Sequence, residues 1–316
     1  MVIDDSVLQA REFKRIMRLM GNSFEITVVA ANEVMGTGYI DAAVAEISRI
    51  EKLLTTFDAN SPTNKINQMA GIRPIKVDRE LFDLIERSVR ISNITQGAFD
   101  ITYGSIDKRL WNFDQTMTKL PDAKTARAIV HLVNYKNILL DQKESSVFLK
   151  EKGMRIGFGG IGKGYAAEMA KNLLKSKGVK SGVVNASGDL TAWGVQVNKK
   201  PWTIGIADPD NVHRPFSYLN ITDMAVATSG NYEKYIILDG KKYSHTIDPK
   251  TGLPVTGIKS VTIITPNAEI ADAMATPVTI MGIKTGLDLI NQMKNIECII
   301  IDDNNNLYSS KNINLQ

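Results

Sequence analysis

The sequence predicts an α+β fold with mixed or antiparallel sheets. Asp239-Gly240 lies between two strand-like runs, which is a strong signal for a β-hairpin. Helical patterns stand singly among the strands, whereas a doubly wound sheet needs strands that alternate regularly with helices. The second half of the chain is richer in strand-like runs, at about 193–197, 202–207, 217–221 and 259–265.

The first half begins with a strand and continues with helices. Residues 24–30 form an apolar strand-like run, and 41–57 carry apolar residues near helical spacing. The segment 58–71 is rich in Asn, Ser, Pro and Gly and is predicted to be a loop. Asp78 suits an N-cap, and the apolar residues after it place one face of a helix against a core.

The remaining elements follow in the same way. Pro121 and Asp122 start a predicted helix that runs through Val133. Short strands are predicted at 137–140 and 146–149, and a glycine-rich entry into a helix at 157–177. A buried strand is predicted at 182–186, and two closing helices at 268–281 and 284–293.

The composition is typical of a soluble globular protein, with 43% apolar and 23% charged residues among 316. Lys and Arg number 38 against 34 Asp and Glu, a net charge of +4. The basic residues are scattered, so the concentrated basic face of a nucleic-acid-binding protein is not predicted. No apolar run reaches the roughly 18 residues that a membrane span needs. The single cysteine, Cys298, cannot form an internal disulfide.

The length favours two lobes. We expect an N-terminal arm over residues 1–19 and one unit over 20–316, whose two tightly packed lobes divide near residue 180. The opening residues lack the continuous apolar stretch of a signal peptide. The sequence therefore predicts a cytoplasmic chain, or one of the cell envelope if an export signal was trimmed from its start.

Five glycines precede a predicted helix in the segment 157–168, GFGGIGKGYAAE. Closely spaced glycines let backbone N–H groups approach a phosphate, and the N-terminus of a following helix favours its negative charge. Lys163 adds a positive charge. The pattern is neither GxGxxG nor a P-loop. A tight strand-to-helix turn without a ligand explains it equally well.

Asp272 and Thr276 are four residues apart, so a helix would place both oxygens on one face. Mg²⁺ accepts carboxylate, hydroxyl and carbonyl oxygens in such an arrangement. Asp272 stands among small and apolar residues, where an unpaired carboxylate is costly to bury. A cation would remove that cost, and so would a helix-capping hydrogen bond.

His245 lies on a predicted strand, before a turn formed by Asp248, Pro249 and Gly252. Histidine is the side chain best suited to proton transfer near neutral pH. The other histidines are His131, in a predicted helix, and His213, in a predicted loop. A purely structural hydrogen bond is the alternative role for His245.

Eight short segments in a fixed order resemble one known family. They are MGN (20–22), FDANSPTNKIN (57–67), GAFDIT (97–102), GGIGKGYAAE (159–168), NASGDL (185–190), AVATSGNYEKY (225–235), SHTIDPKTGLPV (244–255) and ADAMAT (271–276). Together they are similar to the FAD:protein FMN transferases of the ApbE family. The resemblance covers nearly the whole chain from Met20 onward.

The resemblance implies a two-lobed α+β fold with FAD in the cleft between the lobes. It implies a Mg²⁺ site at Asp272 and Thr276, joined by the backbone carbonyls of Gly160 and Ala275. The implied catalytic residues are Asp272, through the metal, and His245, which would take a hydroxyl proton or orient the phosphate. The implied FAD contacts are Met20, Phe57, Ala98, Phe99, Asp100, Gly157, Lys163 and Thr246.

Enzymes of this family attach FMN through a phosphoester to Thr or Ser of an acceptor flavoprotein, and AMP leaves. Some members instead hydrolyse FAD to FMN and AMP. Both reactions need the same ion and cleft, so the sequence leaves both open. A non-catalytic FAD-binding protein is the third alternative.

The chain departs from the family pattern at two motifs. Relatives commonly carry an acidic residue before the glycines, as in DLGGIAKG, whereas Gly157 and Phe158 stand here. Either another acid takes that role or the affinity for FAD is lower. MGN in place of MGT is a milder change, because Asn22 keeps a polar side chain. Relatives are often exported and lipid-anchored, yet these residues include no lipobox cysteine.

Overall fold

The computed structural model describes residues 10–106, 119–208, 211–231, 235–238 and 240–313. Its centre is a sheet of eight strands in the order β1-β2-β6-β7-β10-β13-β14-β15. Every pair of neighbours is antiparallel, which confirms the predicted α+β class. The strands are Arg11–Leu19, Asn22–Ala30, Gly182–Ala186, Asp189–Trp193, Met224–Gly230, Ile258–Thr265, Glu297–Asp302 and Leu307–Ser309.

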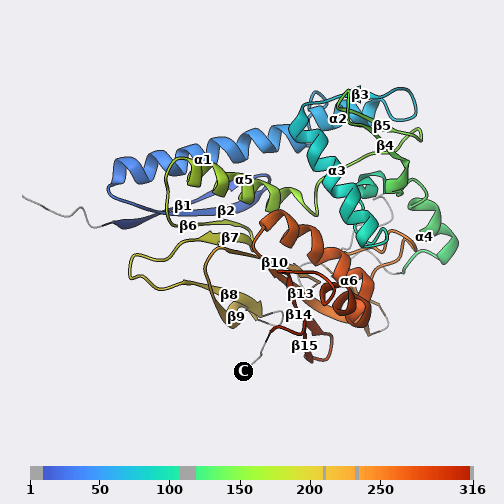
Figure 1. Ribbon diagram of the computed structural model, residues 1–316. Coiled ribbons are helices and arrows are strands. Elements are labelled where there is room, and N and C mark those ends of the chain that lie inside the picture. Colours follow the sequence, from blue (N-terminus) through green and yellow to red (C-terminus); the bar gives the residue numbers. More distant parts are fainter. Residues whose placement is uncertain (1–9, 107–118, 209–210, 232–234, 239, 314–316) are drawn as a thin grey trace, which may run out of the picture.

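Three long helices pack on one face of this sheet: α1 (Glu33–Leu54), α5 (Gly162–Ser176) and α6 (Ala268–Ile290) (Figure 1). Strand side chains alternate between faces, so Phe24, Ile26 and Val28 of β2 join the core beneath the helices. The opposite face buries Val183 and Leu190 under the hairpin of β8 (Trp202–Asp208) and β9 (Asn211–Ile221).

The remaining elements form a second group beside the sheet (Figure 1). It contains a three-stranded sheet in the order β3-β5-β4. Its members are α2 (Pro62–Gln68), β3 (Ile75–Lys76), α3 (Arg79–Ile94), η1 (Ile101–Ser105), α4 (Ala123–Ile129), η3 (Tyr135–Asn137), β4 (Ile138–Asp141) and β5 (Ser146–Leu149). The hairpin of β11 (Tyr235–Leu238) and β12 (Lys241–Ser244) packs its apolar residues near α4.

Several elements differ from the sequence-based expectation. Residues 11–19 are not an arm, because they form β1 and pair with β2 along its whole length. Helix α1 begins at Glu33 rather than 41, because the Asn32 side chain accepts a hydrogen bond from the Met35 N–H at 2.9 Å. The expected loop 58–71 contains α2, which Ser61 caps and Pro62 starts.

The strand expected at 193–197 is wrong in its bounds. Strand β7 occupies 189–193 and ends before Gly194, whose φ of +61° lies outside the β region. His213 lies in strand β9 rather than in a loop. His131 follows the end of α4 instead of lying within it, and its Nδ1 is 2.6 Å from the Ala128 carbonyl oxygen.

Other expectations hold. Gly282, with a φ of +81°, interrupts α6 and so separates two closing helices as the sequence predicted. Leu238 pairs with Lys241 around a two-residue connection, although Asp239 of that predicted turn lies outside the described residues. The main sheet takes strands from both sides of residue 180, so its hydrogen bonding continues across the proposed division. In the described part of the chain, no helix is long and apolar enough to cross a bilayer.

Candidate active site

One end of the main sheet gathers most of the predicted site residues. The turn 20–21 joins β1 to β2, the turn 187–188 joins β6 to β7, and β10 ends at Gly230. Because successive strands are antiparallel, these three points lie at the same end of the sheet. Helix α5 also begins there, since Lys163 in its first turn contacts Asp189 at the start of β7.

Helices α5 and α6 touch at Gly164. A Cβ atom at this position would lie 2.2 Å from the Ala268 carbonyl oxygen and 2.6 Å from the Asp272 Cβ. Only glycine therefore fits, and its missing side chain brings α6 against the first turn of α5. The close approach explains why the glycine-rich segment extends into the helix.

Asp272 caps α5 from the neighbouring helix. Ile161, at the N-cap of α5, supplies no side-chain hydrogen bond. Instead the Gly164 N–H donates to Asp272 Oδ2 at 2.8 Å, and the Lys163 N–H donates to the same carboxylate. The capping and cation explanations for Asp272 were alternatives in the sequence, and the capping bond is present in the structure.

The cap leaves the Asp272 carboxylate short of positive charge. Burial raises its pKa to about 8, and the negative charge of Asp189 contributes. Lys163 and the two backbone N–H groups act in the opposite direction without cancelling the rise. A cation beside Asp272 would stabilise the ionised form of this carboxyl group.

The oxygens around Asp272 suit a hard divalent ion. Thr276 lies one turn further along α6, and within the described residues its hydroxyl makes no hydrogen bond. The Ala275 carbonyl oxygen accepts a hydrogen bond from the Thr279 hydroxyl at 3.0 Å. No group of three or more His, Cys, Asp or Glu side chains with metal-binding spacing occurs among the described residues. The oxygens of Asp272, Thr276 and Ala275 resemble the protein ligands of a Mg²⁺ site, which uses one or two carboxylates together with substrate phosphates.

Lys163 and Asp189 form an ion pair, with 2.6 Å between Nζ and Oδ2. The Asp189 side chain is only 6% exposed, whereas that of Lys163 is 27% exposed. The Lys163 side chain therefore keeps contact with solvent. Asp189 lies within the NASGDL motif, and its ion pair was not predicted from the sequence. The sequence pattern that could have predicted a role for Asp189 is an aspartate directly after a Ser-Gly turn, at the start of a buried strand.

Phe57 is fully exposed on a loop. The residue is 100% exposed, which is unusual for a large apolar residue. The buried Asn64 donates to the Thr56 carbonyl at 2.8 Å and to the Asp58 carbonyl at 2.6 Å. These bonds fix the backbone on both sides of Phe57. Asn64 is a positioning residue that the sequence analysis did not identify.

The aromatic side chain of Phe99 and the flexible side chain of Met20 border the glycine turn before α5. An added Cβ at Gly160 would lie 3.8 Å from the Phe99 ring, and one at Gly162 would lie 3.7 Å from the Met20 methyl group. Met20 itself has a positive φ of +51° in the β1–β2 turn. The structure thus brings Met20 and Phe99 to the glycine turn, and their contact with FAD stays a prediction.

Asp100 holds its own loop together. One oxygen accepts hydrogen bonds from the N–H and hydroxyl of Thr102, and the other accepts from the Tyr135 N–H at 2.8 Å. Burial raises the pKa of Asp100, and these hydrogen bonds partly offset the rise. Ala98 and Phe99 beside it are buried. A direct contact of these three residues with FAD stays a prediction.

His245 follows strand β12 directly and is exposed. Its neighbour Thr246 is buried, and the Thr246 hydroxyl donates to the Asn231 side chain at 3.1 Å. Asn231 comes directly after β10, so this bond ties the His245 segment to the same end of the sheet. Asp248 closes the next turn by accepting bonds from Lys250 and Thr251.

Gly157 has room for a side chain. The nearest atom to an added Cβ is the Thr56 methyl group, at 3.9 Å. Its N–H donates to the Ile101 carbonyl, so its backbone serves the local structure. The glycine that replaces the expected acidic residue is therefore not required by crowding.

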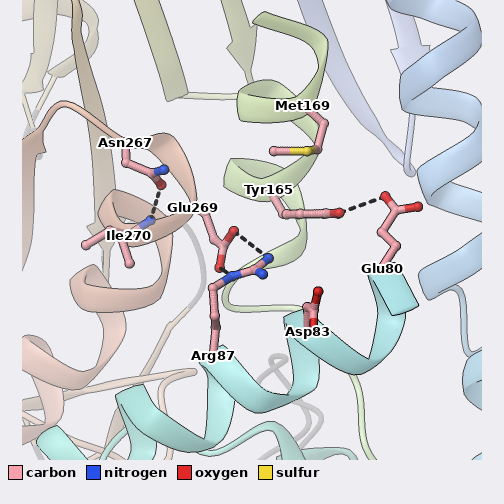
Figure 2. Close-up of a pocket in the computed structure, with 8 residues that line it drawn as sticks. All are labelled: Glu80, Asp83, Arg87, Tyr165, Met169, Asn267, Glu269 and Ile270. Atoms are coloured by element: carbon pink, nitrogen blue, oxygen red, sulfur yellow. Dashed lines mark hydrogen bonds and ion pairs between the residues drawn. The ribbon is translucent and has the colours of Figure 1, made fainter. Parts of the chain in front are cut away.

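A cleft of about 370 Å³ lies elsewhere, between α3, α5 and α6 (Figure 2). Figure 2 shows the Arg87 guanidinium paired with both oxygens of Glu269, and the Tyr165 hydroxyl donating to Glu80. These polar groups are hydrogen-bond partners of one another, and their bonds connect the three helices. The predicted site residues do not line this cleft, whose lining is Glu80, Asp83, Arg87, Tyr165, Met169, Asn267, Glu269 and Ile270.

Comparisons with known proteins show the family to which the chain belongs. The sequence profile described as the ApbE family matches residues 20–300. The chain belongs to the ApbE family. A Klebsiella pneumoniae protein named FAD:protein FMN transferase is 30% identical over 294 residues, which cover 92% of this chain and 90% of the relative. The ApbE chain is therefore an enzyme of the transferase class.

Solved structures of ApbE proteins share the fold. The ApbE protein of Thermotoga maritima is 30% identical, with a TM-score of 0.85 over 95% of this chain and 97% of that one. The flavinyl transferase ApbE of Pseudomonas stutzeri is 24% identical, with a TM-score of 0.84 over 96% of each chain. The ApbE fold thus extends over almost the whole molecule.

Proposed function

We propose that this chain transfers the FMN part of FAD to a Thr or Ser hydroxyl of an acceptor flavoprotein, releases AMP, and depends on Mg²⁺. The observation that supports this most is the buried Asp272 carboxylate at the N-terminus of α5, with its raised pKa. A helix N-terminus favours an anionic phosphate, and a carboxylate in need of positive charge favours a cation. The two together suit a metal-bound diphosphate.

In this proposal Asp272 and Thr276 hold the cation through side-chain oxygens, and Gly160 and Ala275 hold it through carbonyls. When bound, Mg²⁺ supplies positive charge to the phosphate oxygens that the nucleophile must approach. Lys163, partly exposed beside Asp189, adds a second positive charge. Reactions of this class depend mainly on positioning and electrostatics, which these groups provide.

The remaining residues bind the flavin and the acceptor. Phe57 offers an exposed ring on which one of the planar rings of FAD stacks. Met20, Phe99 and the backbone around Gly157 border the glycine turn. His245 takes the proton from the acceptor hydroxyl, whose oxygen forms a bond to the FMN phosphorus while the bond to AMP breaks.

Mass spectrometry of an acceptor domain tests the reaction. The protein is incubated with FAD, Mg²⁺ and a domain that carries a Thr or Ser acceptor site. The proposal expects the acceptor to gain the mass of FMN, with an equal amount of AMP in solution. Free FMN with AMP and an unchanged acceptor would indicate a pyrophosphatase, and unchanged FAD would indicate a binding protein.

Substitution of His245 tests the proton-transfer role. Loss of a general base lowers rates about 10²- to 10⁴-fold. We expect His245→Ala to lower the rate of FMN transfer by this factor while the affinity for FAD stays within about threefold, because the lost group acts on the acceptor. Rapid-mixing transfer assays and flavin fluorescence titration measure the two quantities. His131→Ala, at an exposed turn after α4, is the matched control. Unchanged transfer by His245→Ala would remove the assigned role.

The raised pKa of Asp272 makes metal binding depend on pH. The folded, metal-free chain keeps the Asp272 proton up to about pH 8, whereas an ordinary aspartate loses it near 3.8. Stability of the metal-free chain therefore falls as the pH rises through this window. A cation competes with the proton, so we expect affinity for Mn²⁺ to weaken about tenfold per pH unit below 8. Titration calorimetry between pH 6 and 9 measures this, and affinity that does not change over that range would contradict it.

A further inference from the structure

Three charged side chains meet at the start of α5. Lys163 pairs with Asp189 at 2.6 Å, and both of these residues act electrostatically on Asp272. Asp189 and Asp272 are each less than one-tenth exposed, so water screens their charges weakly. When Asp272 is ionised, as a bound cation requires, the two carboxylates and the one ammonium group carry a net charge of −1.

Asp189 is held on a rigid part of the fold. Strands β6 and β7 pair Ala186 with Asp189 around the two-residue turn Ser187-Gly188. Both turn residues have positive φ, +55° and +98°, the conformation of a type I′ hairpin. The Asn185 side chain also accepts a hydrogen bond from the Gly188 N–H at 2.8 Å. Asp189 therefore starts a central strand with little freedom to move.

Lys163 is the most exposed member of the three. Its ammonium group is a compact charge on a flexible four-carbon stem, and more than a quarter of the side chain is exposed. If Asp189 lost its charge, the nearby Asp272 carboxylate would remain as a partner for that ammonium group. An ammonium ion against Asp272 would stand where a divalent cation has to bind.

We infer that Asp189 is a positioning residue: it holds and neutralises Lys163, and so keeps the Asp272 carboxylate available to the divalent cation. The inference rests on the proposed function, because it concerns the metal site of that reaction. In this role the Asp189 carboxylate contacts neither the metal nor FAD and acts through Lys163.

Binding of Mn²⁺ to the flavin-free protein tests the inference without any catalytic assay. Mn²⁺ is titrated into wild type, Asp189→Asn, Lys163→Met and the double variant, and free ion is counted by electron paramagnetic resonance. A nearby charge changes such equilibria about 10- to 1,000-fold. We expect Asp189→Asn to bind Mn²⁺ at least about tenfold more weakly than wild type, and Lys163→Met at least as tightly.

The double variant distinguishes positioning from a structural role. Removing Lys163 from the Asp189→Asn protein removes the competing charge, so affinity for Mn²⁺ should return to within about threefold of wild type. If Asp189 only supported the fold, the double variant would bind as weakly as Asp189→Asn and melt no higher. That result would overturn the inference.

Other outcomes are equally decisive. Wild-type affinity in Asp189→Asn would overturn the inference and leave the proposed metal site intact. A wild-type protein that binds no Mn²⁺ would overturn the metal site and the inference together. If Asp189→Asn does not fold, Lys163→Met still tests the idea, because weaker binding by that variant would contradict it.

Discussion

Asp272→Asn is expected to lower the rate of FMN transfer by at least about 10³-fold, the effect of several kcal/mol of lost metal stabilisation. The amide oxygen of asparagine can still accept the hydrogen bond that the Gly164 N–H donates to Asp272, so α5 keeps its cap. The amide lacks the negative charge that attracts a divalent ion. Transfer of FMN to an acceptor domain, followed by mass spectrometry, measures the loss.

Two further measurements make the Asp272 result specific. The metal-free variant should melt above wild type at pH 9, because it no longer buries a carboxylate whose proton is lost near pH 8. Asp288→Asn, in the part of α6 beyond Gly282, is the matched control, since the Asp288 side chain is 60% exposed and pairs with Lys284. Full transfer by Asp272→Asn would exclude the proposed metal ligand.

Gly164→Ala is expected to destabilise the fold by about 3 kcal/mol or more. The new methyl group would lie 2.2 Å from a backbone oxygen of α6, and backbone atoms cannot move aside as a flexible side chain can. The two helices would have to separate, which would also lengthen the hydrogen bond to Asp272. Guanidinium unfolding measures the first effect, and Mn²⁺ titration measures the second.

Gly38→Ala is the matched control for this substitution. Gly38 lies within α1, with no atom within 4 Å of an added Cβ and no positive φ. Alanine there should stabilise the helix by roughly 0.5–1 kcal/mol. If Gly164→Ala were as stable as Gly38→Ala, α5 and α6 could not be in the contact described above.

The fold class could be predicted from the sequence because its signals are local. Apolar runs, hairpin turns and helical spacing are patterns of residues close together in the chain. These patterns predicted β2, α5, β6 and β13. Strand β1 was missed because Arg11–Leu19 is an edge strand with basic residues on it, which hides the apolar alternation. Helix α2 was missed because seven residues give too short a pattern, although Ser61 and Pro62 carry a cap signal.

The candidate site could be predicted only in part, because its geometry depends on contacts far apart in the chain. Family motifs pointed to Asp272 and Lys163, but not to the packing at Gly164 that joins their helices. The ion pair of Lys163 with Asp189 follows from the hairpin of β6 and β7. The oxygens of Asp100 accept hydrogen bonds from Thr102 and Tyr135, which the sequence did not predict. The contact of Asp100 with FAD stays a prediction.

A crystal grown with FAD and Mn²⁺, with data collected at the manganese absorption edge, tests the central claim most directly. The account predicts one anomalous peak bonded to the Asp272 carboxylate and the Thr276 hydroxyl, beside the FAD diphosphate at the N-terminus of α5. A flavin seated with its diphosphate in the cleft between α3, α5 and α6, or a manganese ion away from Asp272, would contradict it.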